Sequence, residues 1–398
     1  MDEINVPESE ILARRAKLQR EMQTAELDGI FISQRVDQYY FTGTAQNGYL
    51  YIPVAGEPLL FIKKYLPRAL KESPLRQILG IGSIKEIPSL ITDHYGRLPR
   101  VLGLEFDVLP VRNFNFYRTL FRGSEFVDAS PAILKTRMIK SPWEIEQMEK
   151  TAALSRDIFA YARETLRPGY TELEFAGLLE TFARKHGHGA QLRIRDYQTE
   201  GYPWHILSGA SGGLVGLLDA PASGAGTSAA FPCGAGNKLF APGEPIMIDF
   251  GTVMQGYHID ETRFFAIGAM PERARRACLA AMEIHDSILE RARPGVPLQE
   301  LFQFSVDRAA ALGYADQYLG PPGHKVSFIA HGIGLELIEP PFIASGSRDV
   351  LECGMTLALE PKLVFGGEFS AGIESVFTVT EKGSRLISKT PVEIFILD

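Results

Sequence analysis

Apolar and polar positions alternate along the chain in a way that predicts short strands and amphipathic helices. Residues 11–26 have apolar side chains at helical spacing, and the continuous apolar run of residues 29–32 predicts a strand. Further short apolar runs occupy residues 39–41, 49–52, 59–62 and 101–104, with helical stretches between some of them. This mixture predicts a small α/β domain that ends near residues 128–130.

A helix start separates this domain from the rest of the chain. Residues 141–144, Ser-Pro-Trp-Glu, form a capping-box pattern with proline at the first helical position. The Arg-Pro-Gly of residues 167–169 returns at residues 293–295, each time between two helical stretches. We interpret this repeat as evidence for two pseudo-symmetric halves that share one sheet. The alternative is that a motif that ends helices recurs by chance.

A stretch rich in Gly, Ala and Ser covers residues 208–236 and contains Cys233 near its end. It predicts a long loop, and loops of this length are often functional or mobile. Both interpretations stay open from the sequence.

Composition narrows the class of protein. With 398 residues, the chain is longer than one hydrophobic core usually serves, so we expect two domains. A net charge of −7 gives no sign of a basic binding surface, which argues against nucleic acid as a main partner. The first residues lack a signal-peptide pattern, and no apolar run approaches a membrane span. Three widely spaced cysteines predict neither a disulfide framework nor a zinc knuckle, so a cytoplasmic protein is the simplest expectation.

Two aspartates mark the candidate chemistry. Residues 246–248 predict a buried strand that leads into Asp249, and residues 257–260 predict the returning strand, which ends at Asp260. If the hairpin is symmetric about residues 254–255, Asp249 lies opposite Asp260, with Cβ atoms about 5 Å apart. A buried carboxylate pair needs a proton or a cation. Alternatively, one aspartate caps the strand end while the other faces water, and the hairpin alone does not decide.

Later segments supply further ligand types. His331 stands among glycines, and Glu360 and Glu374 lie on apolar runs that flank Gly366-Gly367. A hairpin centred near Gly367 would bring Glu360 opposite Glu374. The full set is Asp249, Asp260, His331, Glu360 and Glu374.

This set favours a metal site over five separate structural roles. Its four carboxylates carry four negative charges, which two divalent cations would neutralise. Oxygen ligands with one imidazole suit manganese, iron, cobalt or zinc, and the sequence does not choose among them.

These motifs resemble metallopeptidase family M24, the superfamily of Xaa-Pro aminopeptidases, prolidases, methionine aminopeptidases and creatinases. The resemblance rests on Asp249-Phe250-Gly251, on the Gly-Tyr-His-Ile-Asp-Glu-Thr-Arg of residues 256–263, and on residues 331–336, 359–361 and 372–374. It implies a two-domain α+β and α/β fold: a creatinase/prolidase-like N-terminal domain over residues 1–135 and a pseudo-twofold "pita-bread" catalytic domain over residues 136–398.

The resemblance also implies roles for the ligands. Asp249 would chelate one metal ion, Asp260 and Glu374 would bridge two ions, and His331 and Glu360 would hold the second. Manganese is the expected metal, with cobalt, zinc or iron as alternatives. A bridging water would be the nucleophile, and Glu360 would shuttle protons. The resemblance further implies a homodimer in which the N-terminal domain of one subunit caps the other's site.

The sequence departs from the family where the peptidases carry substrate-handling histidines. The equivalent positions hold Cys233, Ser327 and Ile338. A buried isoleucine cannot donate to a developing oxyanion, and losing such a donor typically costs about 10²–10³ in rate. His205, His258 and His324 are candidates to take over this role from other positions, but for each of them a surface or core role is the default interpretation. By the resemblance, His205 begins the loop region where this family builds part of its pocket.

We therefore predict a dinuclear metal hydrolase that cleaves a dipeptide or short peptide. The first alternative keeps the fold and changes the chemistry, as in a creatinase-like C–N hydrolase or a metal-dependent lyase of a small molecule. The second alternative is a non-catalytic binding module, which the presence of all five ligand types disfavours.

Overall fold

A computed structural model describes residues 5–195 and 204–398. Within these residues the chain forms two compact units. One holds residues 5–137 and Arg195, and the other holds residues 138–194 and 204–398. No helix in the described part of the chain is both long and apolar enough to cross a lipid bilayer.

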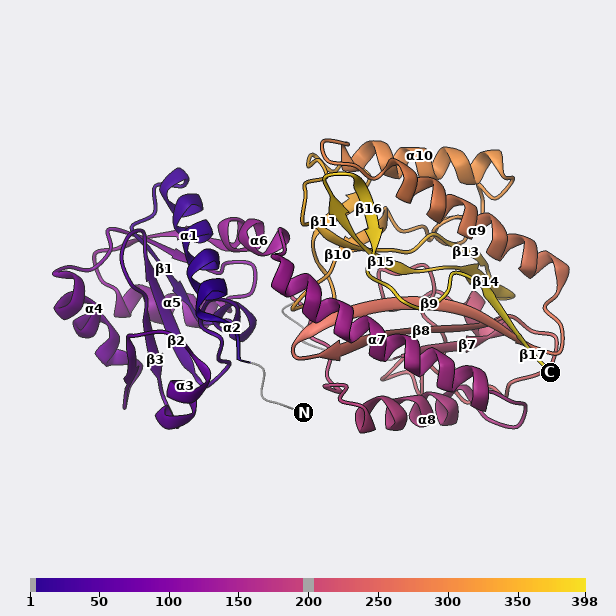
Figure 1. The fold of residues 1–398 in the computed structure, drawn as a ribbon, viewed down its shortest axis with the longest axis horizontal. Helices are drawn as coiled ribbons and strands as arrows, with labels where there is room; N and C mark the ends of the chain where they lie inside the picture. The colour runs from indigo at the N-terminus through magenta and orange to yellow at the C-terminus, as the bar shows by residue number, and fades with distance from the viewer. Residues whose placement is uncertain (1–4, 196–203) are drawn as a thin grey trace. The chain divides into compact units, whose positions relative to one another are not determined.

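The first unit is a mixed sheet with helices around it (Figure 1). Its strands are β1 (Gly29–Ile32), β2 (Gly48–Pro53), β3 (Leu59–Ile62), β4 (Ile78–Gly80), β5 (Val101–Leu104) and β6 (Glu125–Asp128). Its helices are α1 (Glu8–Thr24), α2 (Arg35–Thr42), α3 (Leu66–Glu72), the short η1 (Ile84–Glu86), α4 (Ile87–Tyr95), α5 (Val111–Leu120) and α6 (Ser130–Met138). The strand order is β4-β3-β2-β1-β5-β6. β1 runs antiparallel to β2 and parallel to β5, which makes this an α/β sheet of mixed direction.

Three of the four short apolar runs are strands, namely β2, β3 and β5, but residues 39–41 lie in α2. The side chain of Gln34 accepts a hydrogen bond from the Asp37 N–H at the start of this helix, and Gly43 ends it with φ 75°. A run of three apolar residues does not distinguish a strand from a buried helix. The caps on either side decide the matter here.

The second unit contains the remaining elements. Its strands are β7 (His205–Ser208), β8 (Ile246–Met254), β9 (Tyr257–Ile267), β10 (Phe328–Gly332), β11 (Glu339–Ala344), β12 (Thr356–Leu359), β13 (Lys362–Phe365), β14 (Phe369–Gly372), β15 (Ser375–Thr380), β16 (Gly383–Leu386) and β17 (Ile394–Leu397). Its helices are α7 (Pro142–Thr165), α8 (Glu172–Lys185), the short η2 (Gly209–Gly213), α9 (Glu272–Arg291) and α10 (Leu298–Ala311). Between η2 and β8 the described chain forms no helix or strand, as the glycine-rich composition predicts.

The predicted helix–turn–helix repeat is confirmed. At the start of α7, Ser141 and Glu144 make both hydrogen bonds of the capping box. Gly169 separates α7 from α8 with φ 100°, and Gly295 separates α9 from α10 with φ 86°. Both glycines adopt the left-handed region, which other residues enter at a cost. The Arg-Pro-Gly motif therefore marks the same kind of turn twice.

The expectation that both halves share one sheet is wrong in detail. The strands form a four-stranded sheet β17-β9-β8-β7, a five-stranded sheet β11-β10-β12-β15-β16 and a two-stranded sheet β13-β14. A bridge between Thr262 and Glu374 links the four-stranded sheet to the segment between β14 and β15. The ladder is interrupted at Glu360 and Glu374, where the backbone N–H groups donate to Ile329 and Thr262 instead of to each other.

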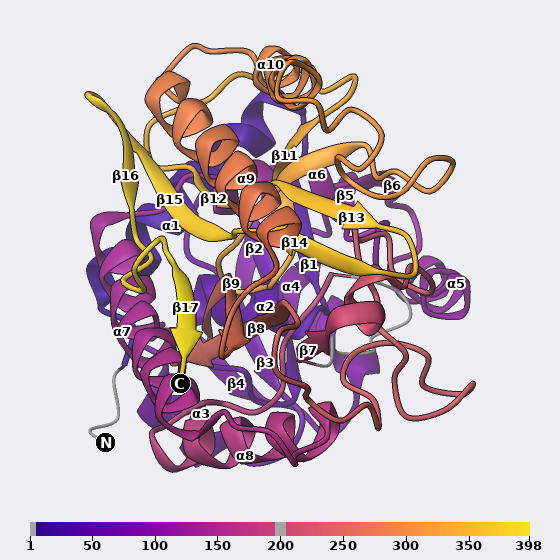
Figure 2. The same ribbon diagram turned by 90° about the vertical axis from the view of Figure 1, so that its right-hand side faces the viewer.

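Helices cover the sheets of this unit on two sides, so that its centre is enclosed. Figure 1 shows α7 and α8 along the strands β7–β9, and Figure 2 shows α9 crossing β14. Along β8, Ile246, Ile248 and Phe250 belong to the core with α7 and α8, whereas Met247 belongs to the core with α9. Side chains alternate along a strand, and Asp249 therefore shares the inward face of Met247.

Candidate metal centre

The hairpin of β8 and β9 carries the two aspartates in a different register from the one predicted. Asp249 pairs with Thr262, and Asp260 pairs with Gly251. The turn residues are Gln255 and Gly256, with φ 54° and 87°. The centre of the hairpin therefore lies one residue later than the predicted centre at residues 254–255. Asp249 and Asp260 are consequently diagonal neighbours on one face, and diagonal pairs lie about 7–8 Å apart between Cα atoms.

Two more segments bring the other ligand residues to the same face. His331 lies on β10, which pairs with β12. The pairing of Leu359 with Ser375 on one side, and of Lys362 with Gly372 on the other, is the register that sets Glu360 opposite Glu374. The second hairpin is thus centred on Gly367, as predicted. The strand pairs on both sides of the interruption at Glu360 and Glu374 keep this same register.

Asp260, His331 and Glu374 form the tightest group. One possible ligand atom from each lies within 4.8 Å of the others. His331 Nε2 is 4.0 Å from Asp260 Oδ2 and 3.9 Å from Glu374 Oε1. Two atoms that bind one ion at about 2.1 Å each are at most about 4.2 Å apart. The two separations from His331 Nε2 lie just inside this limit, so small side-chain adjustments would let the three residues share one divalent ion.

The orientation of His331 also fits a ligand. Its Nδ1 lies 3.0 Å from the carbonyl oxygen of Gly332. Because a carbonyl only accepts, the neutral ring carries its proton on Nδ1 and leaves the lone pair of Nε2 toward the two carboxylates. Burial lowers the pKa of His331, which favours this neutral form.

Burial also shifts the pKa values of the carboxyl groups in this centre. Burial raises the pKa of Asp260 well above its ordinary range, and the charge of Asp249 adds to the shift. Burial likewise raises the pKa of Glu374, with Asp260 as the next contribution. Both shifts mark a concentration of negative charge that a bound cation would relieve.

Lys362 also lies in this centre, although no motif in the sequence singled it out. Its Nζ lies 2.9 Å from Asp249 Oδ2, 2.9 Å from Glu360 Oε2 and 3.4 Å from Glu374 Oε2. Burial opposes the charge of Lys362, but the three carboxylates outweigh it and raise its pKa well above the ordinary value. The available signal was spacing, because residues two apart on a strand share a face and Lys362 stands two positions after Glu360.

A cavity opens from this centre. It is lined by the five predicted ligand residues and Lys362, and also by His205, Phe328, Leu337 and Ile338 together with Leu192, Leu218, Asp219, Ala220, Ala222, Phe250 and Gly251. His205 pairs with Asp249 across β7 and β8. The Nε2 of His205 is buried and has no hydrogen-bond partner in the described chain. Burial lowers the pKa of this imidazole.

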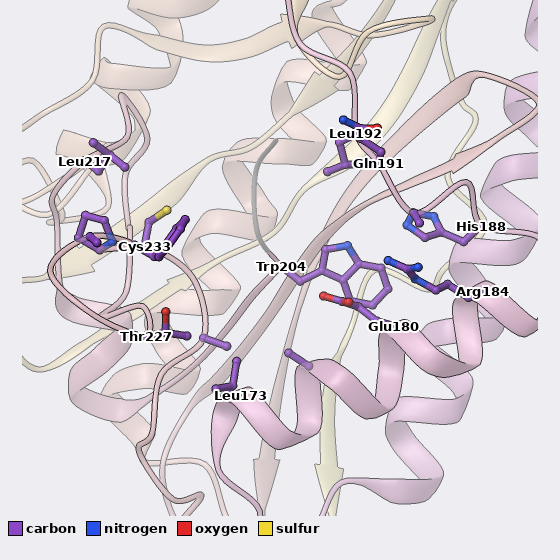
Figure 3. Close-up of a pocket in the computed structure, with 16 residues that line it drawn as sticks. Leu173, Glu180, Arg184, His188, Gln191, Leu192, Trp204, Leu217, Thr227 and Cys233 are labelled. Atoms are coloured by element: carbon purple, nitrogen blue, oxygen red, sulfur yellow. The ribbon is translucent and has the colours of Figure 1, made fainter. Parts of the chain in front are cut away.

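Of the four predicted substrate residues, His205 and Ile338 line the cavity. Ser327 is exposed, and its neighbour Phe328 lines the cavity instead. Cys233 lines a different pocket, which Figure 3 shows with Trp204 between Cys233 and the α8 side chains Glu180 and Arg184. No local pattern in the sequence points to Phe328, because the pairing of β10 with β11 is irregular between Phe328 and Ala330 and strict alternation along the strand does not hold there.

The other two histidines considered from the sequence lie outside the cavity lining. His258 is buried, with its Nε2 accepting from the Arg193 N–H at 3.1 Å and its Nδ1 3.0 Å from the Gly334 carbonyl. His324 is exposed. Neither is among the described residues around the ligand set.

The folded centre is that of a metal-dependent hydrolase, with carboxylates and one imidazole inside a layered α/β unit. Comparison with family models makes the class definite. The model described as "Metallopeptidase family M24" matches residues 146–381, and the one described as "Creatinase/Prolidase N-terminal domain" matches residues 14–139. The chain belongs to metallopeptidase family M24, a family of metal-dependent peptidases. The resemblance inferred from the motifs and the two-domain pita-bread fold are confirmed.

Individual relatives extend over nearly the whole chain. The "Uncharacterized peptidase YqhT" of Bacillus subtilis is 26% identical over 378 residues, covering 93% of this chain and 96% of its own. The "Xaa-Pro dipeptidase" of Pyrococcus furiosus is 26% identical over 385 residues, covering 96% and 99%.

A solved structure has the same fold. The Xaa-Pro dipeptidase from Bacillus anthracis matches with a TM-score of 0.83 and 24% identity, over 97% of this chain and 100% of that one.

Proposed function

We propose that this protein is a metal-dependent dipeptidase that acts on Xaa-Pro dipeptides or similarly short peptides. The observation that carries the proposal is the convergence of Asp260, His331 and Glu374 beside a cavity that His205, whose buried Nε2 has no partner in the described chain, also lines. Membership of family M24 supports it, as do the names of relatives in Pyrococcus furiosus and Lactobacillus helveticus, both "Xaa-Pro dipeptidase". These names do not favour the creatinase-like or lyase alternatives.

The ligand residues Asp260, His331 and Glu374 would hold a divalent ion, with manganese the expected metal. The ion, when bound, would lower the pKa of a water and polarise the scissile carbonyl. Glu360 lines the same cavity with a side chain that is 9% exposed, and we assign its carboxylate the role of accepting a proton and passing it to the leaving amine.

His205 would bind the substrate's carbonyl oxygen. His205 pairs with Asp249 on the neighbouring strand and lines the cavity, and its buried Nε2 has no hydrogen-bond partner in the described chain. A neutral imidazole with a proton on Nε2 donates one hydrogen bond, which is the contribution that Ile338 cannot make. Phe328, Leu337 and Ile338 give the cavity an apolar wall that suits a proline ring.

The test is hydrolysis of a dipeptide panel that includes several Xaa-Pro and several Met-Xaa substrates, with manganese- and cobalt-loaded protein. We expect turnover of the Xaa-Pro class, abolished in Glu360→Gln. His205→Phe should lower kcat by about 10²–10³, the usual cost of one lost donor to a developing oxyanion. His324→Phe, which changes an exposed histidine, is the matched control and should retain full activity.

The absence of turnover by protein with bound metal would overturn the peptidase proposal. Turnover that His205→Phe leaves unchanged would remove His205 from the mechanism. The homodimer, the cytoplasmic location and the domain limits 1–135 and 136–398 stay predictions, and size-exclusion chromatography with light scattering tests the first of them.

A further inference from the structure

Three of the four carboxylates of the centre share a partner that belongs to the chain itself. Lys362 Nζ is within 2.9 Å of Asp249 Oδ2, 2.9 Å of Glu360 Oε2 and 3.4 Å of Glu374 Oε2. An ammonium has three donors and no acceptor, so each donor has a carboxylate available. The lysine thus places a positive charge where the sequence predicts one of two metal ions.

The five predicted ligands divide into two groups around this ammonium. Asp260 and His331 lie with Glu374 Oε1, which is 3.9 Å from His331 Nε2. Asp249 and Glu360 lie with Lys362, which also contacts Glu374 Oε2. Glu374 is therefore shared between a set of ligands open to a metal ion and a set that the ammonium holds.

The position of Lys362 is built into the fold. It is the first residue of β13 and pairs with Gly372 on β14. A Cβ at position 372 would lie 2.8 Å from Lys362 Cγ, so the glycine leaves room for the lysine stem. The Lys362 side chain is only 5% exposed, and a buried ammonium requires partners of opposite charge. Asp249, Glu360 and Glu374 are those partners.

Charge balance argues for one divalent ion rather than two. The four carboxylates carry four negative charges, and the ammonium with one divalent ion supplies three positive charges. A second divalent ion would reverse the sign of the site and stand beside the buried ammonium. Two positive charges that share the same buried carboxylates repel each other strongly.

We infer that Lys362 takes the place of one of the two metal ions, and that each chain binds one divalent ion through Asp260, His331 and Glu374. The inference rests on the proposed function, in which this cluster binds a metal ion. It revises the expectation of two ions, because the ammonium neutralises Asp249 and Glu360 directly. Lys362 thereby acts as a positioning residue for both carboxylates.

The experiment counts metal ions and does not use activity. Protein is loaded with excess manganese, desalted and analysed by mass spectrometry for manganese per chain, with electron paramagnetic resonance to separate isolated ions from coupled pairs. Wild type should bind one isolated ion. Lys362→Met, which removes the ammonium but keeps most of the stem, should bind two ions as a coupled pair.

Lys140→Met is the matched control, because Lys140 is also a buried ammonium, 2.7 Å from Glu339 Oε1 and outside the ligand set. It should still bind one ion. Two ions in wild type, or one ion in Lys362→Met, would overturn the inference. If Lys362→Met does not fold, the wild-type count decides alone.

The outcome separates this inference from the proposed function. A wild type that binds no ion at all would overturn the inference and remove the metal from the proposed mechanism. One bound ion in a protein that cleaves no dipeptide would support the inference and overturn the proposed function instead.

Discussion

Among single residues, Arg263 fixes the position of Glu374 without contacting its carboxylate. The Arg263 guanidinium is fully buried and donates to the carbonyl oxygens of Thr262, Glu374, Thr390 and Pro391. Its planar fork of donors suits this arrangement, which a lysine ammonium cannot reproduce. Arg263 therefore ties the C-terminal segment and the Glu374 backbone to β9.

Replacing this side chain should be costly. We expect Arg263→Met to lower the free energy of unfolding by about 3–5 kcal/mol, the range for removing one member of a buried charged network. Arg263→Lys should cost less, because it keeps the charge opposite Glu261. Urea denaturation of the metal-free protein measures both. Arg348→Met, at an exposed position, serves as the control and should change the free energy of unfolding by less than about 0.5 kcal/mol. A loss below about 1 kcal/mol in Arg263→Met would contradict the account.

Among the elements, the hairpin of β8 and β9 decides where the two aspartates lie. Its turn places Gln255 and Gly256 at φ 54° and 87°, the two positive values of a type I′ turn. Glycine adopts this region freely, whereas glutamine pays for it. The turn holds its position because β8 and β9 pair over nine residues on each side.

Two substitutions in this turn should change the free energy of unfolding in opposite directions. Gln255→Asn should raise the free energy of unfolding by about 0.5–1 kcal/mol, because asparagine tolerates the left-handed region better. Gly256→Ala should lower it by about 1 kcal/mol or more, because alanine pays the left-handed penalty. Chemical denaturation of the two variants measures the difference. Two changes of the same sign would show that the turn does not have the backbone conformation described here.

At the scale of the whole molecule, the proposed metal ligands belong to one of two units with separate hydrophobic cores. The core with Phe31, Phe61 and Phe121 lies in the first unit. The ligand residues and their supporting cores lie in the second. A metal ion that binds only the native second unit stabilises that unit by mass action.

Metal removal should accordingly act on one unit. At a free metal concentration of about 1,000 times Kd, binding adds about 4 kcal/mol to the stability of the native state. We expect a chelator to speed amide hydrogen exchange in β8–β10 and β12–β15 and to leave β1–β6 unchanged. Hydrogen-exchange mass spectrometry with and without chelator measures this. Equal acceleration in β1–β6 would show that the two units do not respond separately.

How much the sequence predicts depends on whether a feature is local. The capping box at Ser141, the repeated Arg-Pro-Gly turns and the register around Gly367 follow from backbone preferences within a few residues, and the structure has all three. The choice of ligand residues also came from the sequence, since paired carboxylates on apolar strands require a charge partner.

The tertiary structure decided what depends on distant contacts. The register of Asp249 against Asp260 turned on a glutamine in the left-handed region, which propensity does not predict. The ammonium of Lys362 meets Asp249 across 113 positions of the chain, and Phe328 reaches the cavity through an irregular strand pairing. Such contacts arise when separate elements pack together, so the sequence determined the ligand types and the fold, whereas packing determined which charges meet at the centre.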